Sequence, residues 1–170
     1  LGDRYQNIKL KYVVQDEALG TGHAVALAER HIKDRFIVMN GDDLFSRKDI
    51  KNIIQFDNCI LLAPKDDVSA FGVVEVKDGL VVDFIEKPKE GTISNSNLVN
   101  TGLYCFTTYI FPILKLLPKS ERGEYEITDA VKHIASLGKM HYQTLQGFWL
   151  PVGYPWHILE ANELLLEGED

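Results

Sequence analysis

The fold class is decided by residues 36–63, which read FIVMNGDDLFSRKDIKNIIQFDNCILLA. Two short apolar runs, Phe36–Met39 and Cys59–Ala63, stand on either side of a more polar stretch. Within that stretch Ser46 and Asp49 have the spacing of a capping box, which predicts the start of a helix. Continuous apolar runs are typical of strands that are covered on both faces. The segment therefore predicts a strand, a crossover helix and a second strand.

The same alternation extends toward the N-terminus. Lys11–Gln15 predicts a strand, and a helix is expected to follow Thr21, because small and apolar residues recur at helical spacing as far as Ile32. With the second helix ending near Phe56, this half of the chain alternates strand and helix. That pattern is typical of a parallel sheet with helices on its faces.

The second half of the chain has a different pattern. Asp78-Gly79 is a strong two-residue hairpin turn between strands expected at 71–77 and 80–86, and Leu98–Phe106 predicts a longer strand. Further helices are expected at 108–117, at 127–137 and from Pro155 onward, with short strands at 140–145 and 148–152. Because no linker separates the two halves, we expect one α/β unit with a mixed, mainly parallel sheet.

Composition limits the classes of function. The 170 residues are 45% hydrophobic and 25% charged, which is ordinary for a globular chain and excludes a disordered one. A formal net charge of −7 without a basic block argues against a nucleic acid polymer as partner. No apolar run approaches the roughly 18 residues of a membrane helix, and no signal peptide is visible. Cys59 and Cys105 lie in apolar stretches, so we expect reduced core cysteines in a cytoplasmic protein.

Asn40-Gly41-Asp42-Asp43 follows a predicted buried strand. Ligands of open α/β sheets bind beyond the carboxyl ends of strands, and a glycine lets the backbone approach a ligand. Carboxylate oxygens suit Mg²⁺, which usually takes one or two carboxylates together with substrate phosphates and water. From these four residues alone, an acidic loop without a ligand is an equally good interpretation.

Two other segments carry candidate ligand groups. Residues 15–24 (QDEALGTGHA) predict a strand end, a glycine turn and a helix start, whose unpaired N–H groups favour an anion or a carbonyl edge. The amide of Gln15 can donate and accept, so it can pair with a nucleobase edge; a capped helix after a polar loop is the alternative. Glu86-Lys87-Pro88 ends the predicted hairpin, where the acid could bind hydroxyls and the base a phosphate. A solvated strand end is the simpler interpretation of that tripeptide alone.

Taken in order, these motifs resemble those of the sugar-1-phosphate nucleotidyltransferases, the pyrophosphorylases that make UDP- and dTDP-sugars. The matching segments cover nearly the whole chain and are QDEALGTGHA (15–24), NGD (40–42), FGVV (71–74), IEKP (85–88), VNTGLY (99–104), EITD (126–129) and GFWLPVGYPW (147–156). The first segment looks closest to uridylyltransferases that act on N-acetylglucosamine 1-phosphate, and glucose-1-phosphate thymidylyltransferases are also similar. The resemblance implies a three-layer, Rossmann-like sandwich and a single nucleotidyltransferase domain over residues 1–170.

The resemblance also implies the reaction. UTP or dTTP and a sugar 1-phosphate, of the N-acetylglucosamine or glucose type, would give an NDP-sugar and pyrophosphate, with Mg²⁺ as cofactor. The sugar phosphate oxygen would attack the α-phosphorus in line, so catalysis would rest on alignment and charge neutralisation. The expected partners are these two substrates, with neither a nucleic acid polymer nor a membrane, and a homo-oligomer stays open.

Roles on the nucleotide side follow from the resemblance position by position. Gln15 matches the glutamine that reads the pyrimidine, with Gly20 and Thr21 at the base. Asp42 matches the catalytic, metal-binding aspartate, and Gly41 before it would let the backbone approach the substrate.

Roles on the sugar side follow in the same way. Gly72 matches the glycine whose backbone lies against the sugar, and Glu86 the carboxylate that binds sugar hydroxyls. Lys87 matches the catalytic lysine that holds the sugar phosphate. The strand that lines the sugar pocket is matched by Asn100, Thr101 and Gly102.

The sequence departs from the family pattern in two places. The signature loop G-x-G-T-R-L, which grips the triphosphate, does not occur, so we expect the protein to have an upstream segment and the 170-residue chain alone not to turn over. The family usually has its other metal-binding aspartate in W-x-D-x-G, where this chain has Pro151. A non-catalytic nucleotide-sugar-binding module of the same fold, and an unrelated α/β binding domain, are therefore alternatives to the enzyme.

Overall fold

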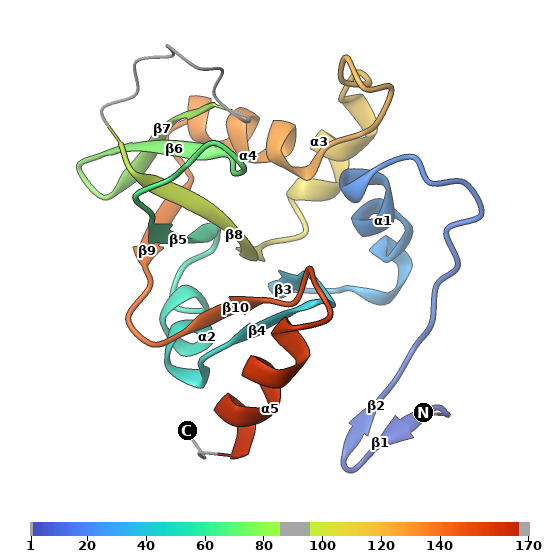
Figure 1. Ribbon diagram of the computed structural model, residues 1–170. Helices are drawn as coiled ribbons and strands as arrows, with labels where there is room; N and C mark the ends of the chain where they lie inside the picture. The colour runs from blue at the N-terminus through green and yellow to red at the C-terminus, as the bar shows by residue number, and fades with distance from the viewer. Residues whose placement is uncertain (1, 86–95, 167–170) are drawn as a thin grey trace.

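The computed structural model describes residues 2–85 and 96–166, and its centre is a six-stranded mixed sheet (Figure 1). Across the sheet the strands follow the order β3 (Phe36–Met39), β8 (Leu98–Phe106), β5 (Cys59–Pro64), β9 (His141–Thr144), β7 (Leu80–Ile85) and β6 (Val73–Lys77). Two ribbons lie outside it and pair β1 (Arg4–Tyr5) with β2 (Ile8–Lys9) and β4 (Asp43–Phe45) with β10 (Trp149–Pro151). The helices of the described residues are α1 (Thr21–Leu27), the 3₁₀ helix η1 (Glu29–His31), α2 (Arg47–Ile53), α3 (Ile110–Leu116), α4 (Ile127–Ser136) and α5 (His157–Leu166).

The segment that decides the fold forms β3, α2 and β5, as predicted. Ser46 caps α2, because its hydroxyl accepts a hydrogen bond from the Asp49 N–H at 3.1 Å. β3 and β5 are not neighbours in the sheet, however, since each pairs antiparallel with β8, which lies between them. Both run opposite to β8 and therefore parallel to each other, as a helical crossover requires.

The prediction of a mixed α/β sheet is confirmed, but the prediction that most pairs are parallel is wrong. Among the described ladders only β5 with β9 is parallel. The cause is β8, which inserts antiparallel between two strands of the first half, and the β6–β7 hairpin, whose pairs are also antiparallel. An apolar run indicates that a strand is covered on both faces and carries no information on its direction.

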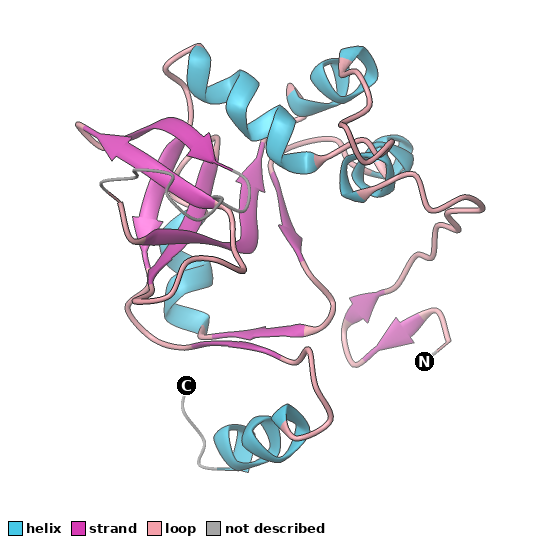
Figure 2. Ribbon diagram, turned by 45° about the horizontal axis from the view of Figure 1, so that its top comes forward, coloured by secondary structure: helices cyan, strands magenta, loops and turns pink. Residues whose placement is uncertain are grey.

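Helices cover both faces of the sheet, which gives the expected three layers. α1, α3 and α4 lie on one face and α2 on the other (Figures 1 and 2). The larger core cluster includes Phe106 in β8, Phe111 in α3 and Ile134 in α4. A smaller cluster joins Ile53 of α2 to Leu61 of β5.

Two further sequence predictions are confirmed. Asp78 and Gly79 have φ values of 51° and 81°, and Lys77 pairs with Leu80 across the turn, so the hairpin forms where a two-residue turn was expected. Cys59 and Cys105 are free, buried and opposite each other in the β5–β8 ladder.

Two local predictions differ from the structure. Lys11–Gln15 forms no strand, and Tyr12 and Val14 in it are exposed. A strand needs a neighbour for its backbone groups, and within the described residues this segment has none. Conversely, β4 is too short to show a sequence period and exists because β10 pairs with it.

α5 lies beside the β4–β10 ribbon, away from the six-stranded sheet (Figure 1). Its apolar side chains are largely exposed, with Leu159 at 72% and Leu166 at 86%. No helix in residues 2–85 or 96–166 has both the length and the apolar character to cross a membrane.

Candidate active site

A cavity of about 330 Å³ lies where β4, β8 and β10 meet the first residues of α1 and α4, and its size suits a small-molecule ligand. Five of the residues that the sequence marks for substrate binding line it, namely Thr21, Gly72, Asn100, Thr101 and Gly102. Asn40, Asp43, Phe71, Tyr104, Arg122, Glu126, Ile127, Thr128, Trp149 and Pro151 complete the lining. The fold thus brings residues from both halves of the chain to one hollow.

β8 supplies the polar floor of this cavity. The side-chain amide of Asn100 donates to the Tyr104 hydroxyl at 2.7 Å and accepts from the Gly102 N–H at 2.9 Å. The Asn100 N–H donates to the carbonyl of Gly72 at 2.9 Å, which holds that glycine against the strand. The Thr101 hydroxyl donates to the Leu61 carbonyl at 2.9 Å and is therefore engaged inside the sheet. The orientation of the Asn100 amide is fixed by its two partners.

Gly102 allows Asn40 to approach the floor closely. Its φ is 80°, a conformation that glycine adopts without steric cost, and a Cβ there would run into the side chain of Asn40. Asn40 in turn donates a hydrogen bond to the Asp43 carboxylate at 3.1 Å. Gly102 therefore leaves room for the contact that orients Asp43.

Asp43 sits at the wall that β4 and β10 form. Burial raises the pKa of the Asp43 carboxyl, and the neighbouring charge of Asp42 acts in the same direction, while the hydrogen bond from Asn40 opposes both. Pro151 stands directly opposite Asp43 in the β10–β4 ladder. The indole N–H of Trp149 is buried and has no hydrogen-bond partner of good geometry among the described residues. It lies close enough to Asp43 to oppose the rise in the pKa of the Asp43 carboxyl.

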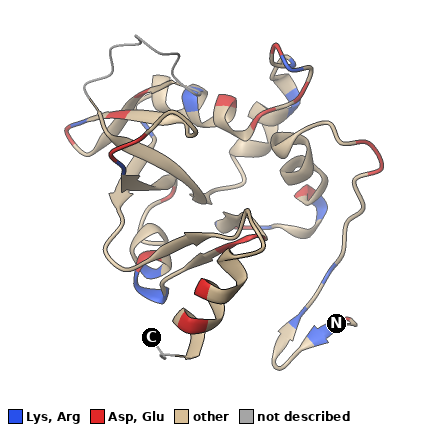
Figure 3. Ribbon diagram, in the orientation of Figure 1, with Lys and Arg blue, Asp and Glu red and all other residues tan. Residues whose placement is uncertain are grey.

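Gly41 and Asp42 form the turn between β3 and β4, and neither lines the cavity. Asp42 is exposed, and its carbonyl accepts from the Val152 N–H at 2.8 Å, which ties the turn to the end of β10. Figure 3 shows the acidic residues at this turn. A Cβ at Gly41 would meet open space, so the protein itself imposes no need for glycine there.

The carboxylates at this turn can be tested against a metal ion. In the part of the chain that the structure describes, no three His, Cys, Asp or Glu side chains form a metal-binding group. Adjacent Asp42 and Asp43 offer hard oxygen ligands of the kind that Mg²⁺ accepts when substrate phosphates and water supply the rest. The described residues fit a substrate-completed Mg²⁺ site rather than a preformed cage.

Gly20 and Thr21 join α1 to α4. Gly20 has a φ of 103°, and a Cβ on it would lie 2.6 Å from the Tyr125 carbonyl oxygen. The Thr21 hydroxyl accepts from the Ile127 N–H at 3.1 Å, which satisfies an N–H in the first turn of α4. Thr21 reaches the cavity, whereas Gly20 serves the close approach of the two chain segments.

Gln15 lies outside the cavity lining and is held by the α1 region. Its amide nitrogen donates to the Gly20 carbonyl at 3.1 Å and lies 2.8 Å from Nδ1 of His23. The amide is therefore oriented by α1 before any ligand binds.

Sequence reasoning missed an ion pair on the cavity wall. Nη2 of Arg122 lies 2.7 Å from Oε1 of Glu126, and the Ser120 hydroxyl donates to the same oxygen at 3.2 Å. The Glu126 side chain is 11% exposed and that of Arg122 is 55% exposed, so the cation is the more accessible partner. Glu126 belongs to the EITD motif, but Arg122 lies in a polar loop that carries no sequence signal.

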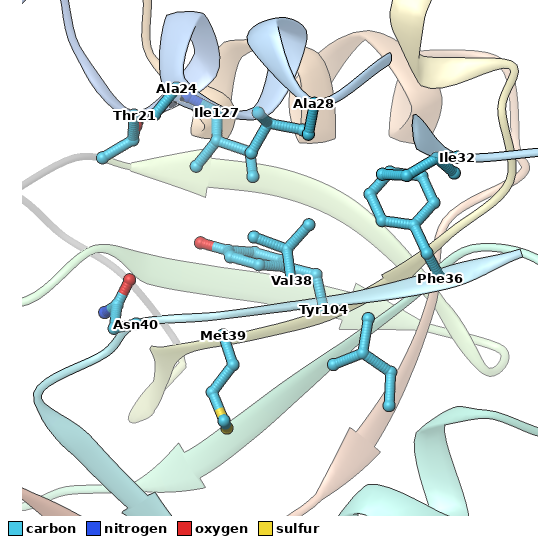
Figure 4. A pocket seen from close by; sticks show the side chains of 12 residues that line it. Thr21, Ala24, Ala28, Ile32, Phe36, Val38, Met39, Asn40, Tyr104 and Ile127 are labelled. Carbon is cyan, nitrogen blue, oxygen red and sulfur yellow. Dashed lines mark hydrogen bonds between the residues drawn. The ribbon is translucent and has the colours of Figure 1, made fainter. Parts of the chain in front are cut away.

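An apolar hollow of about 370 Å³ lies between α1 and β3 and adjoins the polar cavity (Figure 4). Ala28, Ile32 and Phe36 form part of its apolar wall. Four residues line both hollows, namely Thr21, Asn40, Tyr104 and Ile127. In Figure 4 the Tyr104 hydroxyl points to the side where Thr21 and Asn40 lie, so the two hollows meet at polar groups.

Glu86 and Lys87, for which the sequence predicts contacts to the sugar hydroxyls and the sugar phosphate, lie outside the described residues. Their roles stay predictions.

Comparison with known proteins identifies the family. Residues 1–168 match the model of the nucleotidyl transferase family. The bifunctional protein GlmU of Methanococcus maripaludis is 42% identical over 162 residues, which cover 95% of this chain and 39% of the relative. The UTP–glucose-1-phosphate uridylyltransferase AglF of Haloferax volcanii is 34% identical, with 97% of this chain and 70% of AglF covered. The chain thus spans about two fifths of the GlmU relative.

The fold of a solved structure agrees with this assignment. A Bacillus anthracis protein assigned as a glucose-1-phosphate thymidylyltransferase, crystallised with sucrose, superposes with a TM-score of 0.79 and 32% identity. The match covers 94% of this chain and 66% of that protein.

Proposed function

The chain belongs to the nucleotidyl transferase family, and we propose that the protein containing it joins UTP or dTTP to a sugar 1-phosphate and releases pyrophosphate. The observation that carries the proposal is the gathering of Thr21, Gly72 and the strand residues 100–102 around one cavity. The names of AglF and the Bacillus anthracis protein support glucose 1-phosphate as a substrate, and the QDEALGTGHA motif supports an N-acetylated amino sugar. Membership of the family excludes an unrelated binding domain, and no relative named above supports a purely regulatory module.

The proposed reaction is a displacement at phosphorus. An oxygen of the sugar phosphate forms a bond to the α-phosphorus of the nucleotide, and the bond from that phosphorus to the bridging oxygen of the β-phosphate breaks. Pyrophosphate leaves with the electron pair. The protein needs to align the two anions and offset their charge, which requires positioned polar groups rather than a reactive nucleophile.

We assign the sugar to the polar cavity. The Asn100 amide, held by Tyr104 and Gly102, and the backbone at Gly72 form a rigid surface of the kind that recognises hydroxyl groups. Glu86 would bind further hydroxyls and Lys87 the sugar phosphate, as the family motif implies. Arg122 lines this cavity as well, and a phosphate there would compete with Glu126 for its guanidinium.

We assign the base to the region of α1. The Gln15 amide is already oriented by Gly20 and His23, so little conformational freedom is lost when it pairs with a pyrimidine. Thr21 lies at the junction of the polar cavity and the apolar hollow, where base and sugar would meet.

We further propose that Asp42 holds Mg²⁺, with Asp43 at the adjacent position. Mg²⁺ bound there would offset negative charge on the phosphates. Pro151 occupies the place where the family usually has a second carboxylate, so substrate oxygens and water would supply more of the coordination.

Two free, buried cysteines support the proposal of a cytoplasmic protein.

The experiment is a substrate panel with the full-length protein. UTP, dTTP, CTP, ATP and GTP are each paired with N-acetylglucosamine 1-phosphate, glucose 1-phosphate or no sugar, and both pyrophosphate and the NDP-sugar are measured. We expect the two products in equal amounts, with UTP or dTTP and only when a sugar phosphate is present. Pyrophosphate release that ignores the sugar phosphate, or a purine nucleotide as the preferred donor, would refute the proposal.

A further inference from the structure

Asp49 is a fully buried carboxylate in the first turn of α2, outside the lining of the cavity. Its oxygens receive three hydrogen bonds from other groups. The Ser46 hydroxyl donates to Oδ2 at 2.6 Å, the Gln146 N–H donates to Oδ1 at 2.9 Å, and the Gly147 N–H donates to Oδ2 at 2.9 Å. A carboxylate that is removed from water needs such donors, and here two of them come from nearly 100 residues further along the chain.

This arrangement departs from the capping box that the sequence suggests. In a capping box the acidic side chain returns to the N–H of the capping residue. Here the Ser46 N–H donates to the carbonyl of Phe148 at 3.0 Å, and the Asp49 carboxylate turns to Gln146 and Gly147 instead. The turn over residues 146–148 is therefore bound to the start of α2 at two points, the backbone N–H of Ser46 and the carboxylate of Asp49.

Gly147 allows the backbone of this turn to lie close to Ser46 and Asp49. A Cβ at position 147 would run into the hydroxyl of Ser46 and come within 3.0 Å of Oδ2 of Asp49. Only a residue without a side chain lets the backbone of the turn reach both groups.

The turn over residues 146–148 leads directly into β10, which forms part of the cavity wall. Trp149 follows it and pairs with Phe45, and Pro151 pairs with Asp43. Asp43, Trp149 and Pro151 all line the polar cavity. Because the β4–β10 ribbon is separate from the six-stranded sheet, sheet hydrogen bonds do not hold its place. It is held by the packing of Phe45 and Trp149 and by the contacts at its ends.

We infer that Asp49 is a positioning residue, whose buried carboxylate sets the place of Trp149 and Asp43 at the cavity wall. An asparagine in its place keeps the shape but has one accepting oxygen, so it cannot receive both backbone N–H groups on separate oxygens. The Gln146–Phe148 turn would loosen, and the ribbon would keep only the Ser46–Phe148 hydrogen bond of its anchor at the end that carries Trp149. The inference rests on the proposed function only for its effect on turnover, whereas its effect on Trp149 stands alone.

The test uses Asp49→Asn in the full-length protein, in which Trp156 and any tryptophan outside these 170 residues are replaced by phenylalanine, so that Trp149 alone emits. We expect its fluorescence to shift to longer wavelength and to become more accessible to acrylamide. We also expect kcat to fall by about 10–100-fold, the range found when outer partners of a site are removed, with smaller changes in either KM. Ile53→Val is the matched control, since it weakens the buried face of the same helix and touches none of these hydrogen bonds.

A readout that follows lost stability in general would move equally in both variants. Asp49→Asn that folds with parental Trp149 emission and parental kcat would overturn the inference, as would an equal emission shift in Ile53→Val. If Asp49→Asn does not fold, Gly147→Ala loosens the same contact from the turn and leaves the carboxylate in place; unchanged emission there would also overturn it. Parental protein without nucleotidyl transfer would instead refute the proposed function, and the emission of Trp149 would still decide the anchoring.

Discussion

Replacing Gly102 by alanine tests how closely the cavity floor is built. Two costs arise from the structure. The φ of 80° places an alanine in the left-handed region, at about 1–2 kcal/mol. Its Cβ would also meet the Asn40 side chain, whose Cγ would lie 2.9 Å away, and such overpacking costs about 1–3 kcal/mol more.

Gly138→Ala separates the two costs. Gly138 has a φ of 65°, but a Cβ there would meet nothing within 4 Å. Gly138→Ala is therefore destabilised by the backbone conformation alone. The difference in unfolding free energy between the two variants measures the cost of the clash with Asn40. We expect Gly102→Ala to lower the free energy of unfolding by about 1–3 kcal/mol more than Gly138→Ala does.

Urea denaturation followed by circular dichroism gives both values, provided that the transitions are two-state with equal slopes. The displaced Asn40 would also release Asp43, so pyrophosphate release by the full-length protein should fall in Gly102→Ala and not in Gly138→Ala. Equal destabilisation of the two variants, or unchanged turnover in Gly102→Ala, would refute the reasoning that this glycine makes room for the Asn40–Asp43 contact.

Four further predictions concern single residues. Asp42→Ala should abolish pyrophosphate release at saturating Mg²⁺ without unfolding the protein, and parental turnover in that variant would contradict the metal assignment. Lys87→Met should raise the KM for sugar phosphate by about tenfold or more and that for the nucleotide far less, because a charged contact worth about 1.5–3 kcal/mol is lost; equal changes would contradict its role. Pro151→Asp places a carboxylate opposite Asp43 and should lower the Mg²⁺ concentration for half-maximal rate, so an unchanged requirement would refute the lost-ligand argument. Burial raises the pKa of the Cys59 thiol to about 12, so a thiol reagent at pH 8 should modify Cys59 only after unfolding. The stability that the buried thiol contributes should be full below about pH 8.5, the pKa of an exposed thiol, and should decline as pH rises toward 12.

The strands and helices with strong local patterns were predictable from the sequence. β8 forms over the predicted residues, and the β6–β7 hairpin turns at Asp78-Gly79, because an apolar run and a turn dipeptide each encode local structure. Lys11–Gln15 has the same kind of apolar content and forms no strand, since pairing depends on a neighbour that a local pattern does not specify. The insertion of β8 between β3 and β5 is likewise a non-local event.

The candidate site divides along the same line. The residues of the VNTG motif were predictable because a short segment resembles a family motif, and the structure places three of them at the cavity. Arg122 was not predictable, because a single arginine in a polar loop looks like any solvated charge, and its place at the cavity depends on β8 and β10, which other parts of the chain supply. The role of Asp49 was hidden in the same way, because its partners at 146 and 147 are distant in sequence.

The central place of β8 also governs the order in which the molecule can be assembled as it is synthesised. β3 and β5 leave the ribosome before β8, and each needs β8 as an antiparallel partner. Until residue 106 has emerged, both strands present unpaired backbone edges, which are sites of misassociation for a nascent chain. Contacts that close such long loops form slowly. The ligand cavity shares that delay, because its floor is the same strand, and it is complete only when α4 and β10 have followed.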